Sequence, residues 1–142
     1  MTHWRVYAAR LFPGLVVAQA LHRFEEFVSG SYSFFPYVPM AAEMFVLASV
    51  AWLLLLLALI PSVTHRRRWA IWLGGVVALL ELANGADPIL SFAVFRRFVP
   101  GAWTAPLVLG FATAYTVTAF LAARKAAAVQ ESVHPQPETQ AG

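Results

Sequence analysis

The sequence has no cysteine and little charge, and both absences narrow the classes of protein that it can encode. Without cysteine the chain cannot form disulfides, iron–sulfur clusters, haem-thiolate centres or cysteine-ligated zinc sites. Only 12% of its 142 residues are charged, whereas 60% are hydrophobic and the mean hydropathy is +0.66. A soluble domain of this length could not remove so much apolar surface from water. The composition therefore predicts a membrane protein that forms one compact unit.

Four apolar stretches are long enough to cross a hydrocarbon core of about 30 Å as helices that rise about 1.5 Å per residue. They cover approximately residues 6–28, 39–63, 69–95 and 105–123. Because backbone groups in lipid must be hydrogen-bonded within their own segment, each stretch is expected to be a helix. We predict an all-α, four-helix transmembrane bundle over residues 1–125. Residues 130–142 are polar, contain proline and lack apolar periodicity, so we expect residues 126–142 to form a disordered cytoplasmic tail.

Basic residues flank the apolar stretches and predict their orientation. With four spans, seven positive charges share one side and three, Arg23 and Arg96-Arg97, oppose them. The positive-inside rule makes the richer side cytoplasmic, which places both termini there and the chain in the bacterial inner membrane. Because the basic residues lie at the ends of apolar runs, nucleic acid is not an expected partner. The seven charges are those of Arg5, Arg10, residues 66–68 and Arg124-Lys125.

The N-terminus also resembles a secretory signal peptide. Arg5 and Arg10 precede a short apolar run, and Ala18-Gln19-Ala20 resembles a small-x-small cleavage site. Pro13-Gly14 interrupts that run and apolar residues resume beyond the site, so an uncleaved first helix is the preferred interpretation. Cleavage after Ala20 would leave a three-span protein that begins at Leu21.

The first apolar stretch carries a polar face near its outer end. Ionisable residues inside a membrane cost about 2.5–3.5 kcal/mol each on insertion scales, and they therefore indicate function. At about 100° per residue, four polar side chains fall within an arc of about 120°. These residues are Gln19, His22, Glu25 and Glu26.

The third stretch carries a second polar face at a matching depth. Glu81 lies about 18 Å along this helix, just past the midplane. Asn84 shares its face, whereas Asp87 points about 120° away. Glu43, near the start of the second helix, lies close to the same outer surface. We expect the two faces to meet, because neither is tolerable against lipid, and Gly74-Gly75 to allow a close helix approach.

Two runs of residues resemble a known family. Residues 22–26, His-Arg-Phe-Glu-Glu, lie near the end of the first apolar stretch and resemble the signature of the HXXEE family of small bacterial polytopic membrane proteins. Asn84-Gly85, residues 96–101 and Thr104-Ala105 are similar to that family's second pattern. In that pattern an Asn-Gly pair is followed by a helix, a basic-aromatic pair, Pro-Gly and Thr-Ala.

The resemblance covers about residues 6–123 and implies the fold and the site rather than an activity, because the family is functionally uncharacterised. In the family's second pattern a histidine stands four residues after the asparagine, and Pro88 occupies that position here. The resemblance therefore gives no support to a metal centre with two histidines.

The polar faces together form a candidate catalytic or ligand-binding cluster. A histidine beside buried carboxyl groups is suited to proton exchange near neutral pH. A lipophilic ligand would reach the cluster from the outer leaflet and hydrogen-bond to Gln19 and Asn84. The candidate residues are His22, Glu25, Glu26, Glu81 and Asn84.

A divalent metal is the alternative occupant. A histidine with a glutamate four residues later offers two ligands on one helix face, much as Glu-x-x-His does in di-iron bundles. The oxygen-rich set of His22, Glu26 and Glu81 suits iron or manganese more than zinc. The apolar stretches contain only one histidine, however, whereas a di-iron bundle uses two. The cofactor is therefore left open.

A structural role also explains the presence of these polar residues, without catalysis or ligand binding. Acids at headgroup depth would pair with Arg23 or Arg96-Arg97, and Glu81 would hydrogen-bond to Asn84, as in an accessory subunit of a membrane complex. The lipid bilayer is the one partner that the sequence predicts. The sequence does not decide between an enzyme, a ligand-binding protein and a structural subunit, and it does not give the oligomeric state.

Overall fold

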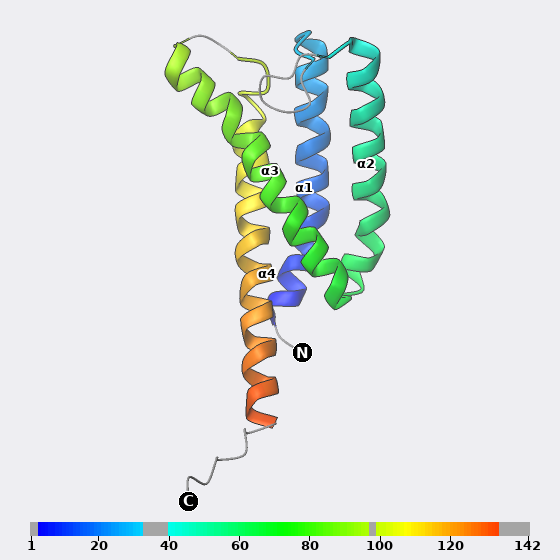
Figure 1. Ribbon diagram of the computed structural model, residues 1–142, viewed down its shortest axis with the longest axis vertical. Helices are drawn as coiled ribbons and strands as arrows, with labels where there is room; N and C mark the ends of the chain where they lie inside the picture. The colour runs from blue at the N-terminus through cyan, green and yellow to red at the C-terminus, as the bar shows by residue number, and fades with distance from the viewer. Residues whose placement is uncertain (1–2, 33–39, 97–98, 134–142) are drawn as a thin grey trace, which may run out of the picture.

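The computed structural model describes residues 3–32, 40–96 and 99–133, and it contains four helices in these ranges (Figure 1). No strand occurs among the described residues, so the predicted all-α fold is confirmed. The helices are α1 (His3–Val28), α2 (Ala42–Thr64), α3 (Arg68–Phe95) and α4 (Ala105–Val133).

Three helices have an end that differs clearly from the predicted limit. Helix α1 begins at His3 rather than near residue 6. The predicted start of the second helix at residue 39 lies outside the described residues, and α2 begins at Ala42. The fourth helix begins at Ala105 as expected but continues to Val133, well beyond the predicted end near Ala123. Ala126-Ala127-Ala128 favours this extension, because alanine has the best helix propensity of all residues. The rest of the predicted tail, residues 134–142, lies outside the described residues.

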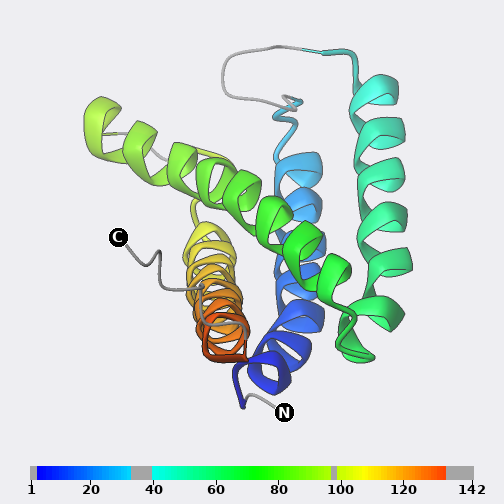
Figure 2. The same cartoon turned by 60° about the horizontal axis from the view of Figure 1, so that its bottom comes forward.

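Helix α1 occupies the centre of the bundle and packs against the other three helices (Figures 1 and 2). Helix α2 contacts α1 and α3, and α3 also packs along α4. A short turn joins α2 to α3 at one end, and from there the two helices diverge toward the opposite end. The polar residues of α1 and α3 lie toward the end where α2 and α3 diverge.

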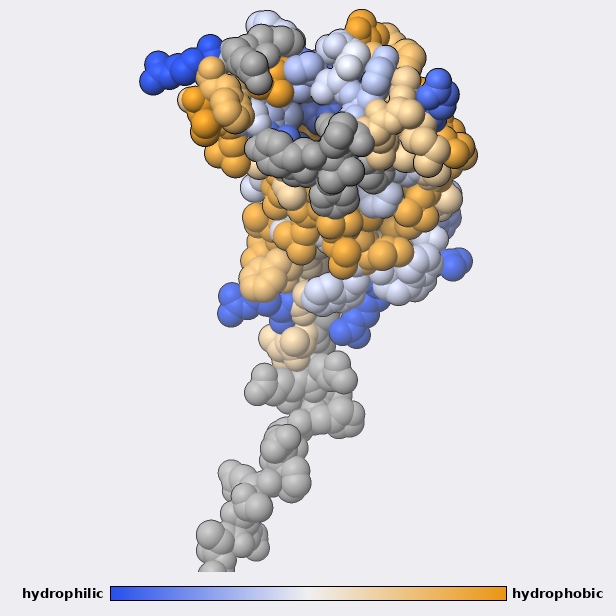
Figure 3. All heavy atoms as spheres, turned by 45° about the horizontal axis from the view of Figure 1, so that its top comes forward, coloured by the Kyte–Doolittle hydropathy of each residue, from blue (hydrophilic) through white to orange (hydrophobic). Residues whose placement is uncertain are grey.

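Three of the described helices are long and apolar enough to cross a membrane: α2, α3 and α4 as far as Lys125. They expose large apolar side chains, including Leu54 (60% exposed), Leu90 (62%) and Val94 (71%). On the face that Figure 3 shows, hydrophobic residues form a band across the middle, and hydrophilic ones gather below and above it. Soluble monomers rarely expose such large apolar patches, whereas lipid covers them readily. Helix α1 is too polar to qualify by itself, so the predicted four-span arrangement stays a prediction.

The half of the bundle away from the polar residues has an ordinary apolar core. Phe12, Leu15 and Leu56 are fully buried there, together with Tyr115 of α4. The Tyr115 hydroxyl donates a hydrogen bond to the Ile71 carbonyl at 3.2 Å. This buried phenol therefore has a partner for its polar atom, as a buried tyrosine usually does.

Gly74 and Gly75 allow a close helix approach, as expected, and the helix that approaches them is α4. A Cβ at Gly74 would collide with the Tyr115 hydroxyl, and one at Gly75 would lie 3.8 Å from Ala119. Both neighbours belong to α4, so the two glycines allow α3 to approach α4 rather than α1. Small residues serve this purpose in membrane bundles generally.

Candidate functional site

The end of α1 is fastened to the turn that precedes α4. Glu25 accepts hydrogen bonds from the backbone N–H groups of Gly101 (3.0 Å), Trp103 (3.3 Å) and Thr104 (3.0 Å). It also accepts one from the Thr104 hydroxyl at 2.6 Å. These donors belong to the turn before Ala105, the first residue of α4. A carboxylate from α1 therefore supplies the acceptors for backbone N–H groups of this turn.

His22 binds the same turn and is completely buried. Its Nδ1 lies 2.9 Å from the Thr104 hydroxyl oxygen. Gly101 has a φ of +88°, and a Cβ there would lie 2.7 Å from His22 Cε1. Only glycine allows the backbone to approach the imidazole this closely and to adopt this conformation without strain. Two letters of the motif, His22 and Glu25, thus hold the Pro-Gly and Thr-Ala element that the sequence analysis compared with the family's second pattern.

The last acid of the motif pairs with an arginine inside the bundle. Arg23 (5% exposed) donates to Glu26 (7% exposed) at 2.8 Å. Its guanidinium also donates to Asn84 Oδ1 at 3.3 Å and lies over the Phe45 ring, 5.9 Å from the centroid. Arg23 entered the sequence analysis only as an outward charge or a possible partner of headgroup-depth acids. The signal for its burial was present, because it follows Gln19 by four residues and precedes Glu26 by three.

Asn84 joins the polar faces of α1 and α3. Its amide nitrogen lies 3.3 Å from Gln19 Oε1 and 3.2 Å from Glu81 Oε2. Gln19 is fully buried and Glu81 is 2% exposed. The prediction that these two faces meet is confirmed, and Asn84 is the residue through which they do so.

Helix α2 contributes two residues that the sequence analysis missed. Trp52 Nε1 donates to Glu81 Oε1 at 2.7 Å. Ser49, one turn earlier, is buried with its hydroxyl unpartnered among the described residues. With Phe45 they form a stripe at the i, i+4, i+7 spacing of one helix face. The signal was weak, because one serine and one tryptophan in a long aliphatic run are compatible with plain packing.

Not every buried polar atom of the cluster has a partner. Within the part of the chain that the structure describes, His22 Nε2, Gln19 Nε2 and Ser49 Oγ make no hydrogen bond. His22 Nε2 lies 3.6 Å from Glu26 Oε1, beyond the usual hydrogen-bond distance. A buried polar group without a partner costs roughly 1–3 kcal/mol, so three of them in one cluster require an explanation.

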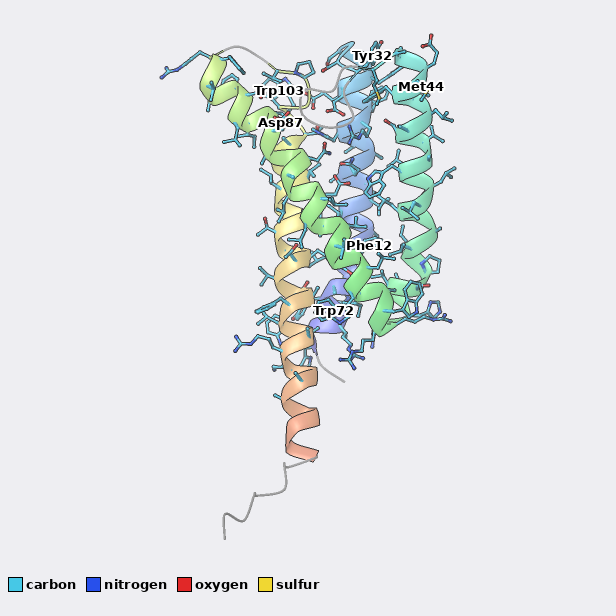
Figure 4. The ribbon with its side chains drawn as sticks, viewed as in Figure 1. Phe12, Tyr32, Met44, Trp72, Asp87 and Trp103 are labelled. Atoms are coloured by element: carbon cyan, nitrogen blue, oxygen red, sulfur yellow. The ribbon has the colours of Figure 1, made fainter. Side chains whose placement is uncertain are left out.

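The remaining acidic candidates lie apart from this cluster. Glu43 is exposed in the first turn of α2, and Asp87 is half-buried on α3. Figure 4 places Asp87 and Trp103 at the same end of the molecule as Tyr32 and Met44. Among the described residues, no three His, Asp or Glu side chains gather as metal ligands would. The structure therefore gives no support to the alternative metal site of His22, Glu26 and Glu81.

An apolar groove adjoins the turn that His22 and Glu25 hold. It has a volume of about 200 Å³ and lies between the C-terminal part of α3 and the turn before α4. Its walls are Ile89, Phe92, Ala102 and Trp103, of which Trp103 is 79% exposed. The groove is open to the surface that lipid would cover. Its wall residue Ala102 follows Gly101, where an added Cβ would lie 2.7 Å from His22 Cε1.

The fold and the site define a helical membrane protein with a polar cluster inside an apolar exterior. The model of the family described as "Protein of unknown function with HXXEE motif" matches residues 14–116, and the chain belongs to this family. The resemblance seen in residues 22–26 is thereby confirmed. Comparison with curated proteins and with solved structures gave no match.

Proposed function

We propose that the protein binds or acts on a lipophilic small molecule through the buried polar cluster. The observation that carries the proposal is the set of unpartnered buried atoms on His22, Gln19 and Ser49. Buried polar groups in folded proteins are nearly always hydrogen-bonded, so a site that leaves several unpaired is suited to a polar ligand group. The apolar groove between Phe92 and Trp103 supports a ligand whose remainder is lipophilic.

Retention of a ligand tests this proposal. Protein purified in mild detergent should carry a lipophilic molecule, detected by mass spectrometry of an organic extract. His22→Ala and Glu81→Gln should each lower its occupancy roughly tenfold, the factor that corresponds to about 1.4 kcal/mol of lost interaction. Glu43→Gln is the matched control, since Glu43 is an exposed acid outside the cluster, and it should retain the molecule. An extract that contains only bulk lipid in bulk proportions would contradict the proposal.

The topology belongs to the same proposal. We place α1 as a fourth span, both termini in the cytoplasm and the polar cluster in the outer half of the inner membrane. The supporting evidence is the excess of Lys and Arg at the α2–α3 turn and near the chain ends. Polar side chains of α1 contact one another and Asn84 of α3. These contacts lower the free-energy cost of placing the charged residues of α1 in a membrane. Cleavage after Ala20 would remove Gln19, so the proposed site requires the uncleaved chain.

Reporter fusions test the topology. Fusions after Arg68 and Lys125 should report a cytoplasmic location, because the positive-inside rule keeps these charges there. A fusion at Ser31, between α1 and α2, should report an external one. An external signal at Arg68 would reverse the orientation and move the cluster to the inner leaflet.

A structural role in a membrane complex is the second candidate, and a specific observation favours it. The Glu25 carboxylate accepts hydrogen bonds from the turn before α4, and Glu26 pairs with Arg23. These contacts fasten helices and require no ligand. If this role is the whole function, His22→Ala and Glu81→Gln should lower thermal stability, and the parent should carry no bound molecule.

A further inference from the structure

The Thr104 hydroxyl has a single proton, and its neighbours decide where that proton goes. Its oxygen lies 2.6 Å from Glu25 Oε2 and 2.9 Å from His22 Nδ1. Each Glu25 oxygen also accepts a backbone N–H, which is the role of an ionised carboxylate. The hydroxyl therefore donates to Glu25 and accepts a hydrogen bond from His22 Nδ1–H.

This chain of hydrogen bonds selects one tautomer of His22. In a neutral imidazole whose proton is on Nδ1, Nε2 carries a lone pair and can only accept. Nε2 faces Glu26 Oε1 at 3.6 Å, and Glu26 is itself an acceptor from Arg23. Two acceptors thus face each other, and His22 Nε2 is the one that still lacks a donor.

The orientation of the Gln19 amide follows by the same kind of argument. Arg23 can only donate, so Asn84 presents Oδ1 to it and its NH₂ to Gln19 and Glu81. Gln19 must then present its oxygen to Asn84. Its NH₂ group is left as a buried donor without a partner in the described chain.

A buried acceptor and a buried donor therefore lie one turn apart on the same face of α1. His22 and Gln19 are spaced i, i+3, which brings their side chains within about 5–6 Å at Cβ. A hydroxyl group can donate to His22 Nε2 and accept from Gln19 Nε2 at once. An ammonium group can only donate, and an ether or ketone oxygen can only accept.

We infer that the site takes the hydroxyl group of a lipophilic alcohol, with His22 Nε2 as its proton acceptor and Thr104 and Glu25 as positioning residues that fix the His22 tautomer. This inference rests on the proposed function and names the ligand class for it. The apolar groove beyond Gly101 is available for the hydrocarbon part of the alcohol.

Nitrogen-15 NMR of His22 tests both parts of the inference. Replacing His3, His65 and His134 with asparagine leaves His22 as the single imidazole. The variant is placed in nanodiscs of phosphatidylcholine, a lipid without a hydrogen-bond donor. The spectrum should show the Nδ1–H tautomer. Adding 1-decanol should shift the Nε2 resonance in the direction of an accepted hydrogen bond, whereas decyl methyl ether at equal concentration should not.

Two variants of Thr104 complete the test. Thr104→Val keeps the side-chain shape without the hydroxyl, and it should change the ratio of the two tautomers roughly fivefold, as expected for one hydrogen bond of ordinary strength. Thr104→Ser should restore the parent ratio. The Nε2–H tautomer in the parent, or the same ratio in Thr104→Val, would overturn the positioning role. Equal responses to decanol and the ether, or none to either, would overturn the alcohol and leave water as the group at Nε2.

The outcome is separable from that of the proposed function. The retention assay detects any bound lipophilic molecule, whatever its polar group, and it does not depend on the tautomer of His22. A retained molecule without a hydroxyl would keep the proposed function and overturn this inference. Bulk lipid alone in the extract, with no response of Nε2 to decanol, would contradict both.

Discussion

Replacing Arg23 with methionine should lower the free energy of unfolding by about 3–5 kcal/mol, the usual effect of removing one partner of a buried ion pair. The loss leaves the Glu26 carboxyl buried without its donor at 2.8 Å. It also removes the donor to Asn84 Oδ1, the residue that joins α1 to α3. Unfolding by titration with sodium dodecyl sulfate, followed by tryptophan fluorescence, measures the change.

A double variant separates this effect from simple loss of a side chain. Arg23→Met with Glu26→Met removes both charges and keeps similar volumes, so it should recover most of the stability. Arg10→Met, at an exposed position of the same helix, is the control and should change stability by no more than about 0.5 kcal/mol. A cost below about 1 kcal/mol for Arg23→Met would show that the pair is solvated, as exposed pairs are.

Replacing Gly101 with alanine should destabilise the protein by about 2–3 kcal/mol. The left-handed backbone at φ +88° costs a residue with a Cβ about 1 kcal/mol or more. The Cβ would also lie 2.7 Å from His22 Cε1 and 3.3 Å from Pro88 Cγ, which displaces the imidazole from Thr104 and removes a hydrogen bond of about 1 kcal/mol. The same detergent titration measures it.

Gly30 provides the matched control for that experiment. Its φ is +71°, and no described atom lies within 4 Å of the place where a Cβ would stand. Gly30→Ala should therefore show the backbone cost alone, about 1 kcal/mol or more. The difference between the two variants reports the displacement of His22. Equal effects of the two substitutions would mean that the contact between Gly101 and His22 contributes nothing.

Hydropathy and helical phase were sufficient for the fold and for the meeting of α1 with α3. Apolar length alone indicates four helices, and the i, i+3 spacing of Gln19 and His22 indicates the inward face of α1. Arg23 was missed because it was counted with the flanking charges rather than placed by phase. Its burial beside Glu26 shows that charge near a helix end does not by itself indicate the surface.

The partners of Glu25 could not be predicted from side-chain patterns. Three of its hydrogen bonds come from backbone N–H groups, which every sequence has and which no residue type marks. The choice of α4 as the neighbour of Gly74 has a similar cause, because shape rather than polarity decides which helix approaches a small residue. The role of Trp52 could not be predicted either, because a tryptophan in an aliphatic run is equally compatible with lipid and with a protein neighbour.

The contacts between α1 and the turn before α4 also bear on the order in which the helices insert into the membrane. Glu25 and Gly101 are 76 residues apart, and His22 and Thr104 are 82 apart. During synthesis α1 leaves the ribosome long before its partners exist, and it is the one described helix too polar to qualify as a span by itself. We expect α1 to wait at the membrane surface and to insert stably only after α4 has emerged. The first helix to be synthesised would then be the last to settle.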